Sequence, residues 1–180
     1  MHKFSPNHTA PSGSGYATCA DFCGILVKNL RPLYLLAFLL TGNHTEAEQC
    51  FVATIEDCIG AKSVFKGWEN SWSKRCLIIN AIRRVFSTPG ESRPAKRREA
   101  KAGSPERLAI LGLIRMPPLH RFVFVMSVLE RYTVHECALL LHCPVRNVLE
   151  ARINALSQLS SFGPQFIKAE ERRTQITIGA

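Results

Sequence analysis

Helical periodicity between residues 116 and 159, interrupted by two short turns, limits the fold more than any other feature of this sequence. The proline pair Pro117–Pro118 suits the start of a helix, and apolar residues then recur at helical spacing. A second helix is expected after Thr133, because the Thr133–Glu136 segment has the form of a capping box. Pro144 ends the second pattern and suits the first position of a third helix. The apolar positions assigned to the buried seams of these helices are Leu119, Phe122, Val123, Met126, Leu129, Cys137, Ala138, Leu141, Val145, Val148, Leu149 and Leu156.

A helix, a tight turn and a second helix over an apolar seam form the unit with which many proteins read the major groove of DNA. The second helix of that unit enters the groove. The polar residues of the helix that begins at Pro144 are therefore the candidate contacts. Any compact unit of three helices would show similar periodicity, and the pattern alone leaves this alternative open.

Composition indicates a folded helical protein. Hydrophobic residues make up 46% of the 180 residues and charged residues 21%, which is typical of a globular chain. No strand-type alternation is sustained, so an all-α fold class is expected. The longest apolar run, Leu33 to Leu40, is far shorter than the ~20 residues of a membrane span. The first 20 residues also lack the apolar stretch of a secretory signal, so we expect a cytoplasmic protein that does not enter a membrane.

Charge and composition divide the chain into two small helical modules joined by a flexible basic linker. Between Arg83 and Arg107 there are eight basic and three acidic residues, an excess of five within a formal net charge of +9. Basic linkers are attracted to phosphates without sequence selectivity, although a solvated tether would have the same composition. The candidate phosphate contacts are Arg93, Lys96, Arg97, Arg98 and Lys101. The expected divisions are a flexible N-terminal tail (1–20), a first domain (21–86), the linker (87–108), a second domain (109–161) and a C-terminal tail (162–180).

The first module is expected to contain three helices. An opening helix carries the apolar residues Leu26, Leu30, Leu33, Ala37 and Leu40 and becomes apolar on nearly all sides after Leu33, so it should be central. Gly42 supplies a helix stop, and the Thr45–Glu48 segment is a second capping box that starts the next helix. The third helix covers residues 71–86. The residues predicted to be buried on the second and third helices are Ala47, Cys50, Phe51, Thr54, Ile55, Cys58, Trp72, Cys76, Ile79, Ile82 and Phe86.

Aromatic and basic residues interleave between Lys62 and Arg75, from the end of the second helix into the third. Flat rings stack on unpaired bases and cations neutralise phosphates, so this mixture suits a single-stranded nucleic acid. The competing interpretation is that Phe65 and the two tryptophans only anchor the loop to the core.

The two modules and the linker together resemble bacterial RNA polymerase sigma factors of the extracytoplasmic-function type. The segment Leu33–Glu48 is similar to the opening of that family's second region, in which Leu-Tyr-x-Leu-Ala-x-x-Leu-Thr-Gly leads into an acidic stretch and a long helix. Residues 116–159 are similar to the fourth region, where a Leu-Pro start leads to two helices, a turn and a recognition helix. The order and the spacing match over about 125 of the 180 residues.

The resemblance implies a function in transcription initiation, with RNA polymerase core and double-stranded promoter DNA as partners. The family's second region docks on the polymerase and helps to open the promoter, and its fourth region reads a more distant promoter element. An anti-sigma protein is a further partner that such proteins can have. The implied polymerase-binding residues are Glu46, Gln49, Ala53 and Glu56. The implied promoter-opening residues are Phe65, Lys66, Trp68, Trp72, Lys74 and Arg75, and the implied contacts of the recognition helix (144–158) are Arg146, Asn147, Glu150, Arg152 and Asn154.

Departures from the family pattern keep a second interpretation open. Val52 and Ala53 stand where the docking helix usually carries a Gln-Glu pair, and the Arg-Asn pair usual after Trp72 is absent. Glu150 stands on the normally basic face of the recognition helix. A carboxylate near DNA is tolerated mainly when it accepts from a cytosine amino group. The alternative is a degenerate sigma-like adaptor or regulator that acts through protein–protein contacts without reading a promoter.

Neither catalysis nor a metal site is expected. The sequence has no glycine-rich phosphate loop, nucleophile elbow or catalytic carboxylate pair, so we expect no enzyme and no cofactor. Two histidines and two cysteines lie within residues 135–143, but their spacing does not fit the paired ligands of zinc modules. Cys19 and Cys23, four residues apart, are a weak second candidate for metal binding or reactivity. The seven cysteines, odd in number and irregularly spaced, are expected to be reduced and mostly buried.

Overall fold

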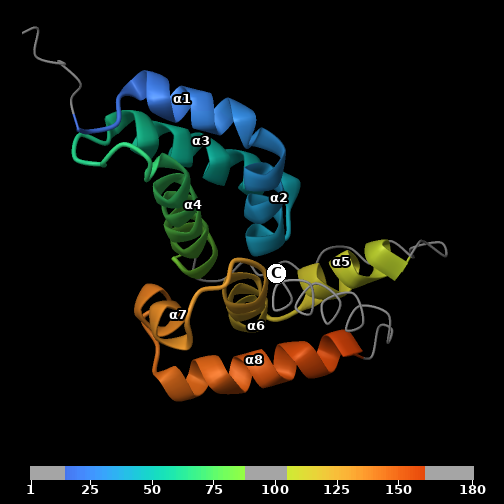
Figure 1. Ribbon diagram of the computed structural model, residues 1–180. Coiled ribbons are helices and arrows are strands. Elements are labelled where there is room, and N and C mark those ends of the chain that lie inside the picture. Colours follow the sequence, from blue (N-terminus) through green and yellow to red (C-terminus); the bar gives the residue numbers. More distant parts are fainter. Residues whose placement is uncertain (1–14, 88–104, 161–180) are drawn as a thin grey trace, which may run out of the picture.

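The computed structural model describes residues 15–87, the first half below, and residues 105–160, the second half (Figure 1). Both halves are helical apart from turns, as expected for an all-α protein, and no strand forms within them. In these ranges no single helix is long and apolar enough to cross a membrane, and only the bent pair α1–α2 reaches that length and apolarity when the two are combined. The elements are α1 (Cys19–Lys28), α2 (Leu30–Thr41), α3 (His44–Gly60), α4 (Glu69–Phe86), α5 (Pro105–Arg115), α6 (Pro118–Phe124), the π-helical segment η1 (Val125–Leu129), α7 (Val134–Leu140) and α8 (Val145–Ser160).

The predicted opening helix is in fact two helices. α1 ends at Asn29, whose Nδ2 donates to Ile25 O at 3.0 Å, and α2 continues at an angle of 77°. Pro32 explains the break, because its ring would clash with the carbonyl of Lys28 in a continuous helix. Leu30, predicted on the apolar face, is 52% exposed as a result. The residues of α2 that do turn inward are Leu33, Leu36, Ala37, Leu39 and Leu40.

The buried face of α3 confirms the prediction, but the start of the helix does not. The cap is Asn43, whose Oδ1 accepts from the backbone N of Thr45 at 2.8 Å, so the predicted capping box at Thr45–Glu48 is wrong. Gly42 ends α2 in the left-handed conformation (φ +74°), as the predicted helix stop requires. The buried residues of α3 are Ala47, Cys50, Phe51, Thr54 and Cys58, and Ile55 is half-buried.

The buried face of α4 is rotated from the predicted one. Trp72 and Phe86 are 40% and 47% exposed, whereas Ser73 and Asn80 are buried. Ser73 Oγ donates to a carbonyl one turn earlier at 2.7 Å, and Asn80 Nδ2 donates to Asp57 Oδ2 at 2.8 Å. The prediction drew the face through apolar residues only, but polar side chains that find hydrogen-bond partners are readily buried.

The second half begins earlier than expected. α5 starts at Pro105, inside the segment assigned to the linker. α6 and η1 bury Phe122, Val123 and Met126 as predicted, whereas Leu129 is 38% exposed. The capping box at the start of α7 is confirmed, because Thr133 and Glu136 exchange hydrogen bonds.

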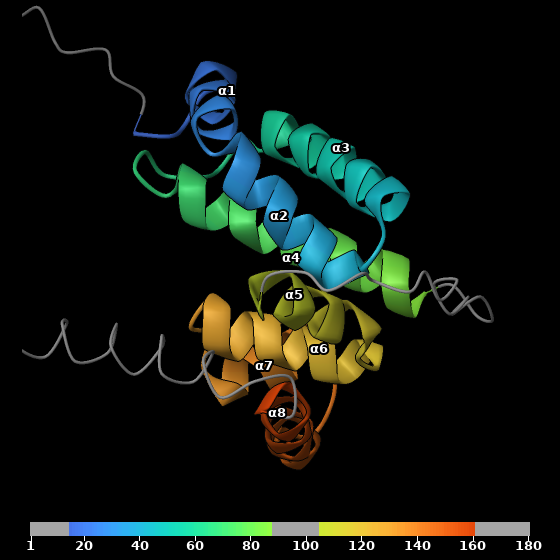
Figure 2. The ribbon, with the colours of Figure 1, turned by 90° about the vertical axis from the view of Figure 1, so that its right-hand side faces the viewer.

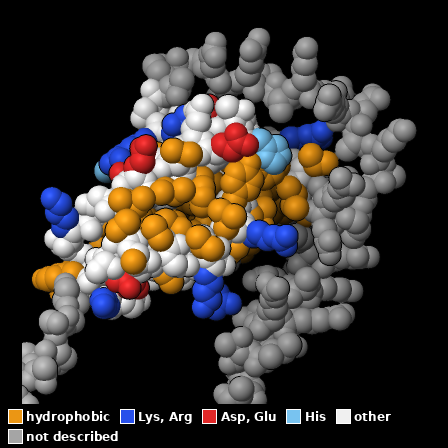
Figure 3. Space-filling view, turned by 90° about the horizontal axis from the view of Figure 1, so that it is seen from above, with side chains coloured by type: hydrophobic (Ala, Val, Ile, Leu, Met, Phe, Trp, Pro, Cys, Tyr) orange, Lys and Arg blue, Asp and Glu red, His pale blue; other side chains and the backbone are white. Residues whose placement is uncertain are grey.

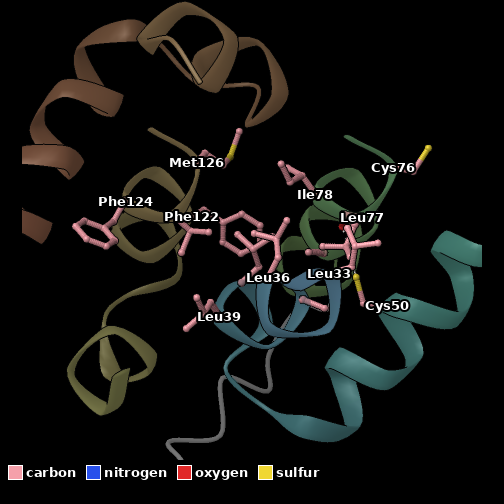
Figure 4. Close-up of a cluster of buried hydrophobic side chains, with 14 of the residues drawn as sticks. Leu33, Leu36, Leu39, Cys50, Cys76, Leu77, Ile78, Phe122, Phe124 and Met126 are labelled. Carbon is pink, nitrogen blue, oxygen red and sulfur yellow. Dashed lines mark hydrogen bonds between the residues drawn. The ribbon is translucent and has the colours of Figure 1, made fainter. Parts of the chain in front are cut away.

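The two halves share one hydrophobic core. α2 packs against α5, α6 and η1, and the views in Figures 1 and 2 both show the first half lying directly on α6. Phe122 and Met126 face Leu36 and Ile78 across this boundary (Figure 4). The Phe122 ring also packs edge-on against Phe86, with centroids 5.2 Å apart. Burial of these side chains on both sides indicates that the halves fold together.

Arg121 is a buried cation at this boundary. Its Nε donates to Leu40 O at 3.0 Å and its Nη2 to Thr41 O at 3.3 Å, while Nη1 donates to Ile114 O at 2.9 Å. The carbonyls at the end of α2 carry the negative end of the helix dipole, which stabilises the cation. Burial lowers the pKa of the Arg121 guanidinium to about 10, so it stays charged at neutral pH. A Cβ at Gly42 would lie 3.0 Å from Arg121 Nη1, so a side chain there would press on the guanidinium in addition to straining the backbone.

Candidate nucleic-acid interfaces

Three aromatic rings form an exposed group where the α3–α4 loop meets the segment before α1. Tyr16 and Phe65 stack with centroids 5.1 Å apart and an interplanar angle of 23°, and Phe65 meets Trp68 edge-on at 6.1 Å. Phe65 and Trp68 are 54% and 66% exposed. We call Tyr16, Phe65 and Trp68 the aromatic cluster. Rings this exposed do little to anchor a loop to the core, and the parts of Phe65 and Trp68 that are not covered by the neighbouring rings are open to a stacking partner.

Backbone hydrogen bonds hold the aromatic cluster in position. Tyr16 and Phe65 form an isolated backbone bridge, flanked by the bonds from Ala17 N to Val64 O at 2.6 Å and from Lys66 N to Gly15 O at 3.1 Å. Gly67 then turns the chain with φ +89°, a conformation that a side chain would strain. The rings are therefore presented by fixed backbone, which lowers the entropy lost on binding.

Tyr16 was missed by the sequence analysis, because residues 1–20 were assigned to a flexible tail. Residues 15–20 are folded, and α1 begins at Cys19 under a capping box formed by Thr18 and Asp21. Thr18 and Asp21 have the spacing of that motif in the sequence, so a helix start here could have been recognised. The pairing of Tyr16 with Phe65, 49 positions along the chain, could not.

The predicted basic residues of this surface separate into two groups. Lys66 is exposed next to the aromatic cluster. Lys74 is instead engaged in an ion pair across the two halves, with its Nζ 2.7 Å from Glu130 Oε2. Arg75 lies close enough to Tyr132 and Glu136 to interact with them electrostatically. The geometry thus brings Phe65, Lys66, Trp68 and Trp72 together at one end of the first half, whereas Lys74 and Arg75 face the second half.

The predicted polymerase-binding residues of α3 do not form one open face. Arg84 of α4 donates from Nε to Glu46 Oε2 at 2.9 Å and also donates to Gln49, so both side chains are tied to the neighbouring helix. Ala53, predicted to be exposed, is half-buried, whereas Glu56 is exposed as predicted. The exposed residues along the outer side of α3 are Glu48, Val52, Glu56 and Ile59.

A tight turn joins α7 to α8. His142 adopts a left-handed conformation (φ +50°) that residues other than glycine rarely adopt, and Cys143 N donates to Ala138 O at 3.1 Å to close the turn. α8 begins at Val145, one residue later than predicted. The two helices pack through the buried Cys137 and the side of α8 that faces it.

The apolar side of α8 differs from the predicted seam. Leu149 and Leu156, assigned inward, are 45% and 44% exposed, and Ile153 is 66% exposed. These three residues share one side of the helix, and we call them the apolar strip. The prediction failed because it assigned the large apolar side chains to the buried face, whereas the buried face of α8 contains two alanines. The residues that α8 buries are Val148, Ala151, Ala155 and Leu159.

The polar candidates on α8 are accessible, but their charge is partly cancelled. Arg146 Nε lies 3.2 Å from Glu150 Oε1, and the two side chains are 85% and 60% exposed. Such exposed pairs on one helix contribute only about 0.3–0.5 kcal/mol, so a phosphate or a base edge can replace the carboxylate. Asn147 and Asn154 are exposed as predicted, and Arg152 is half-buried.

Two further predictions concern the linker and metal ligands. Within residues 15–87 and 105–160, no three His, Cys, Asp or Glu side chains come together as a metal site. The linker residues proposed to contact phosphates, Arg93, Lys96, Arg97, Arg98 and Lys101, lie outside the described residues.

The chain matches no known protein-family model and no curated protein.

Proposed function

We propose that this protein is a sigma-factor-like transcription initiation protein that binds RNA polymerase core and promoter DNA, and that it acts in the cytoplasm. The observation that carries the proposal is the aromatic cluster beside Lys66. Base stacking on one exposed ring contributes about 1–3 kcal/mol and does not depend on sequence, while a lysine supplies a phosphate contact. Two members of the cluster, Phe65 and Trp68, also lie in the loop to which the resemblance assigns promoter opening.

The remaining parts of the proposal follow from the order of the elements. The two halves act as separate modules when bound to polymerase and DNA, and the basic segment between them contacts phosphates. α7, the turn and α8 act as a helix-turn-helix, in which Arg146 exchanges Glu150 for a phosphate or a guanine edge. Support comes from the exposure of Arg146, Asn147 and Asn154 on the polar side of α8.

A sigma-like adaptor that binds proteins without reading a promoter is the second candidate. The apolar strip of α8 favours it, because interfaces with DNA are more polar and more positively charged than interfaces with proteins. Leu139 of α7, 74% exposed, adds to the apolar surface of this half. The Arg146–Glu150 ion pair also favours the adaptor, because it cancels the positive charge that is expected on a helix in the major groove of DNA.

The test is transcription by purified polymerase core supplemented with this chain, using a pool of randomised promoters. Selective transcription from a subset of the pool is the expected result. Binding to core without selective transcription would favour the adaptor, and failure to bind core would remove the sigma-factor proposal.

A charge reversal on α3 sharpens the test of docking. Glu56→Lys should reduce capture of polymerase core without unfolding the protein, because Glu56 is exposed. Ala53→Arg is a poorer probe, because Ala53 is half-buried and a bulky cation there would disturb packing. The matched control is Glu150→Lys, the same reversal in the second half, which should leave capture of core unchanged.

A further inference from the structure

We propose that Cys19 and Cys23 form a binding site for a soft, thiophilic metal ion of low coordination number, with monovalent copper, Cu(I), as the ion it fits best. The two Sγ atoms lie 4.0 Å apart on neighbouring turns of α1, and both side chains are exposed. The other five cysteines of the chain are buried or half-buried. All seven cysteines lie within the described residues, so this is the only exposed pair of thiols in the protein.

The separation of the two sulfur atoms suits a bridging ion. A metal–thiolate bond is about 2.3 Å long, so one ion held by two thiolates sets the sulfurs about 4.0 Å apart at an angle of about 120° and about 4.6 Å apart when the arrangement is linear. The observed separation of 4.0 Å equals the first value, and side-chain rotation would have to add about 0.6 Å to reach the second. The backbone of α1 therefore holds both ligands ready for an ion that needs few of them.

The same geometry argues against a disulfide and against a structural zinc site. Residues four apart on a helix have Cβ atoms about 5–6 Å apart, whereas a disulfide requires about 3.5–4.5 Å, so oxidation would distort α1. Structural zinc takes four protein ligands, but no third His, Cys, Asp or Glu joins this pair among the described residues. Paired thiolates with no harder ligand select Cu(I) among the biological metals.

The position of the pair at the start of α1 supports the anionic form that binding requires. Two thiolates and one monovalent cation carry a net negative charge, and the amino end of a helix stabilises negative charge. Both thiols must lose their protons to bind the ion, so affinity should fall as the pH falls.

The α1 side of the molecule carries an apolar surface. Figure 3 looks down on this side and shows a band of hydrophobic side chains with charged side chains and a histidine around it. Val27, one turn beyond Cys23, is 78% exposed. Ala17, two residues before Cys19, donates a backbone hydrogen bond to Val64 O in the α3–α4 loop. A bound ion would stabilise the first turns of α1, and through them the backbone that carries Tyr16.

The test is an oxygen-free titration of the full chain with Cu(I) against a chromophoric Cu(I) chelator. The unaltered protein should take up one equivalent, and X-ray absorption should show sulfur atoms as the nearest neighbours of the copper. Cys19→Ser and Cys23→Ser should each weaken binding by about 100-fold, because the second of two linked ligands binds at high effective concentration. Cys143→Ser, which removes a half-buried thiol in the second half, is the control and should not change affinity.

Two outcomes would overturn the proposal. One is a Cys19→Ser, Cys23→Ser double variant that retains the affinity of the unaltered chain. The other is loss of binding in the control or in a Cys58→Ser variant, which would assign the copper to buried thiols. Circular dichroism of the exposed-site variants checks that α1 is intact, so that a loss of affinity reports on the ligands and not on folding.

Discussion

The resemblance assigns Phe65 and Trp68 of the aromatic cluster and the polar side of α8 to DNA, yet these two surfaces are built in opposite ways. In the cluster, exposed rings stand on backbone hydrogen bonds, and Lys66 lies beside them. On α8, the apolar strip runs next to a cation that already has a carboxylate partner. On the first surface Lys66 interacts with the Asp21 carboxylate without an ion pair within 4.0 Å, whereas on the second Arg146 must exchange its ion pair with Glu150. Nucleic-acid binding is therefore better supported in the first half than in the second.

The boundary between the halves holds both of these surfaces on one folded body. Arg121 joins the end of α2 to the start of α6, and the side chains around it belong to one core. In the described arrangement the two surfaces are carried by one folded body. A protein that works as two modules must open this boundary, which breaks the hydrogen bonds of Arg121, the packing of Phe122 and the Lys74–Glu130 ion pair.

The largest expected effect comes from removing the cation at the boundary. Arg121→Ala should lower the free energy of unfolding by about 3–5 kcal/mol, because buried carbonyls lose a charged donor and a cavity remains. Urea denaturation followed by circular dichroism measures the loss. Arg115→Ala, at an exposed site on α5, should stay within about 0.5 kcal/mol of the parent. A variant at Arg121 that is as stable as that control would show that the halves do not depend on each other.

A smaller effect is expected at the aromatic cluster. Trp68→Ala should weaken binding of a single-stranded oligonucleotide by about 1–3 kcal/mol, since one stacking surface is lost. Stability should hardly change, because the side chain is 66% exposed. Fluorescence anisotropy with a labelled oligonucleotide measures affinity, and Leu139→Ala is a control that removes another exposed hydrophobic side chain. Equal oligonucleotide affinities of the two variants would show that Trp68 does not bind the single strand, and nucleic-acid binding would then be no better supported in the first half than in the second.

The corresponding test of α8 uses a duplex. If α8 reads a base through a bidentate contact, Arg146→Ala should cost about 1–3 kcal/mol at that base pair only. Glu150→Lys should raise affinity for all sequences alike, because it removes repulsion and adds a phosphate contact. If neither variant changes duplex affinity while Ile153→Asp abolishes capture of a protein partner, α8 is a protein-binding helix.

The smallest expected effect compares the helix caps of the two halves. Hydrogen bonds from the backbone and side chain of Thr18 lower the pKa of Asp21, and those from Thr133 lower the pKa of Glu136. Because its pKa is lower in the folded state, each carboxylate stabilises the fold at a pH above its ordinary pKa, which is 3.8 for Asp21 and 4.5 for Glu136. This stabilisation is lost as the pH falls through the lower pKa of the folded state. Asp21→Asn and Glu136→Gln should each flatten the acid side of a plot of melting temperature against pH. If the melting temperature of both variants fell with acid as steeply as that of a Glu48→Gln control, the role of the caps would be contradicted.

Local features of this protein could be predicted from its sequence because they depend on neighbours a few residues away. The buried face of α3, the helix stop at Gly42 and the capping box at Thr133 follow from helical periodicity, a left-handed glycine and a motif of four residues. The break before α2 belongs to the same class, although Pro32 was not used to predict it. The exposed position of Phe65 and Trp68 was one of two alternatives that composition left open.

What only the tertiary structure decided involves partners far apart in the sequence. Arg121 donates a hydrogen bond to Leu40, 81 positions away, and Tyr16 pairs with Phe65 through the backbone, so no local sequence pattern predicts either contact. The buried side of α4 includes Asn80 because Asp57 of α3 satisfies its amide. The apolar strip of α8 faces outward because the alanines on the opposite side allow closer packing than leucines would. In each case a residue's hydrophobicity sets its preference for burial, but the shape and the hydrogen-bonding groups of a distant neighbour determine whether burial occurs.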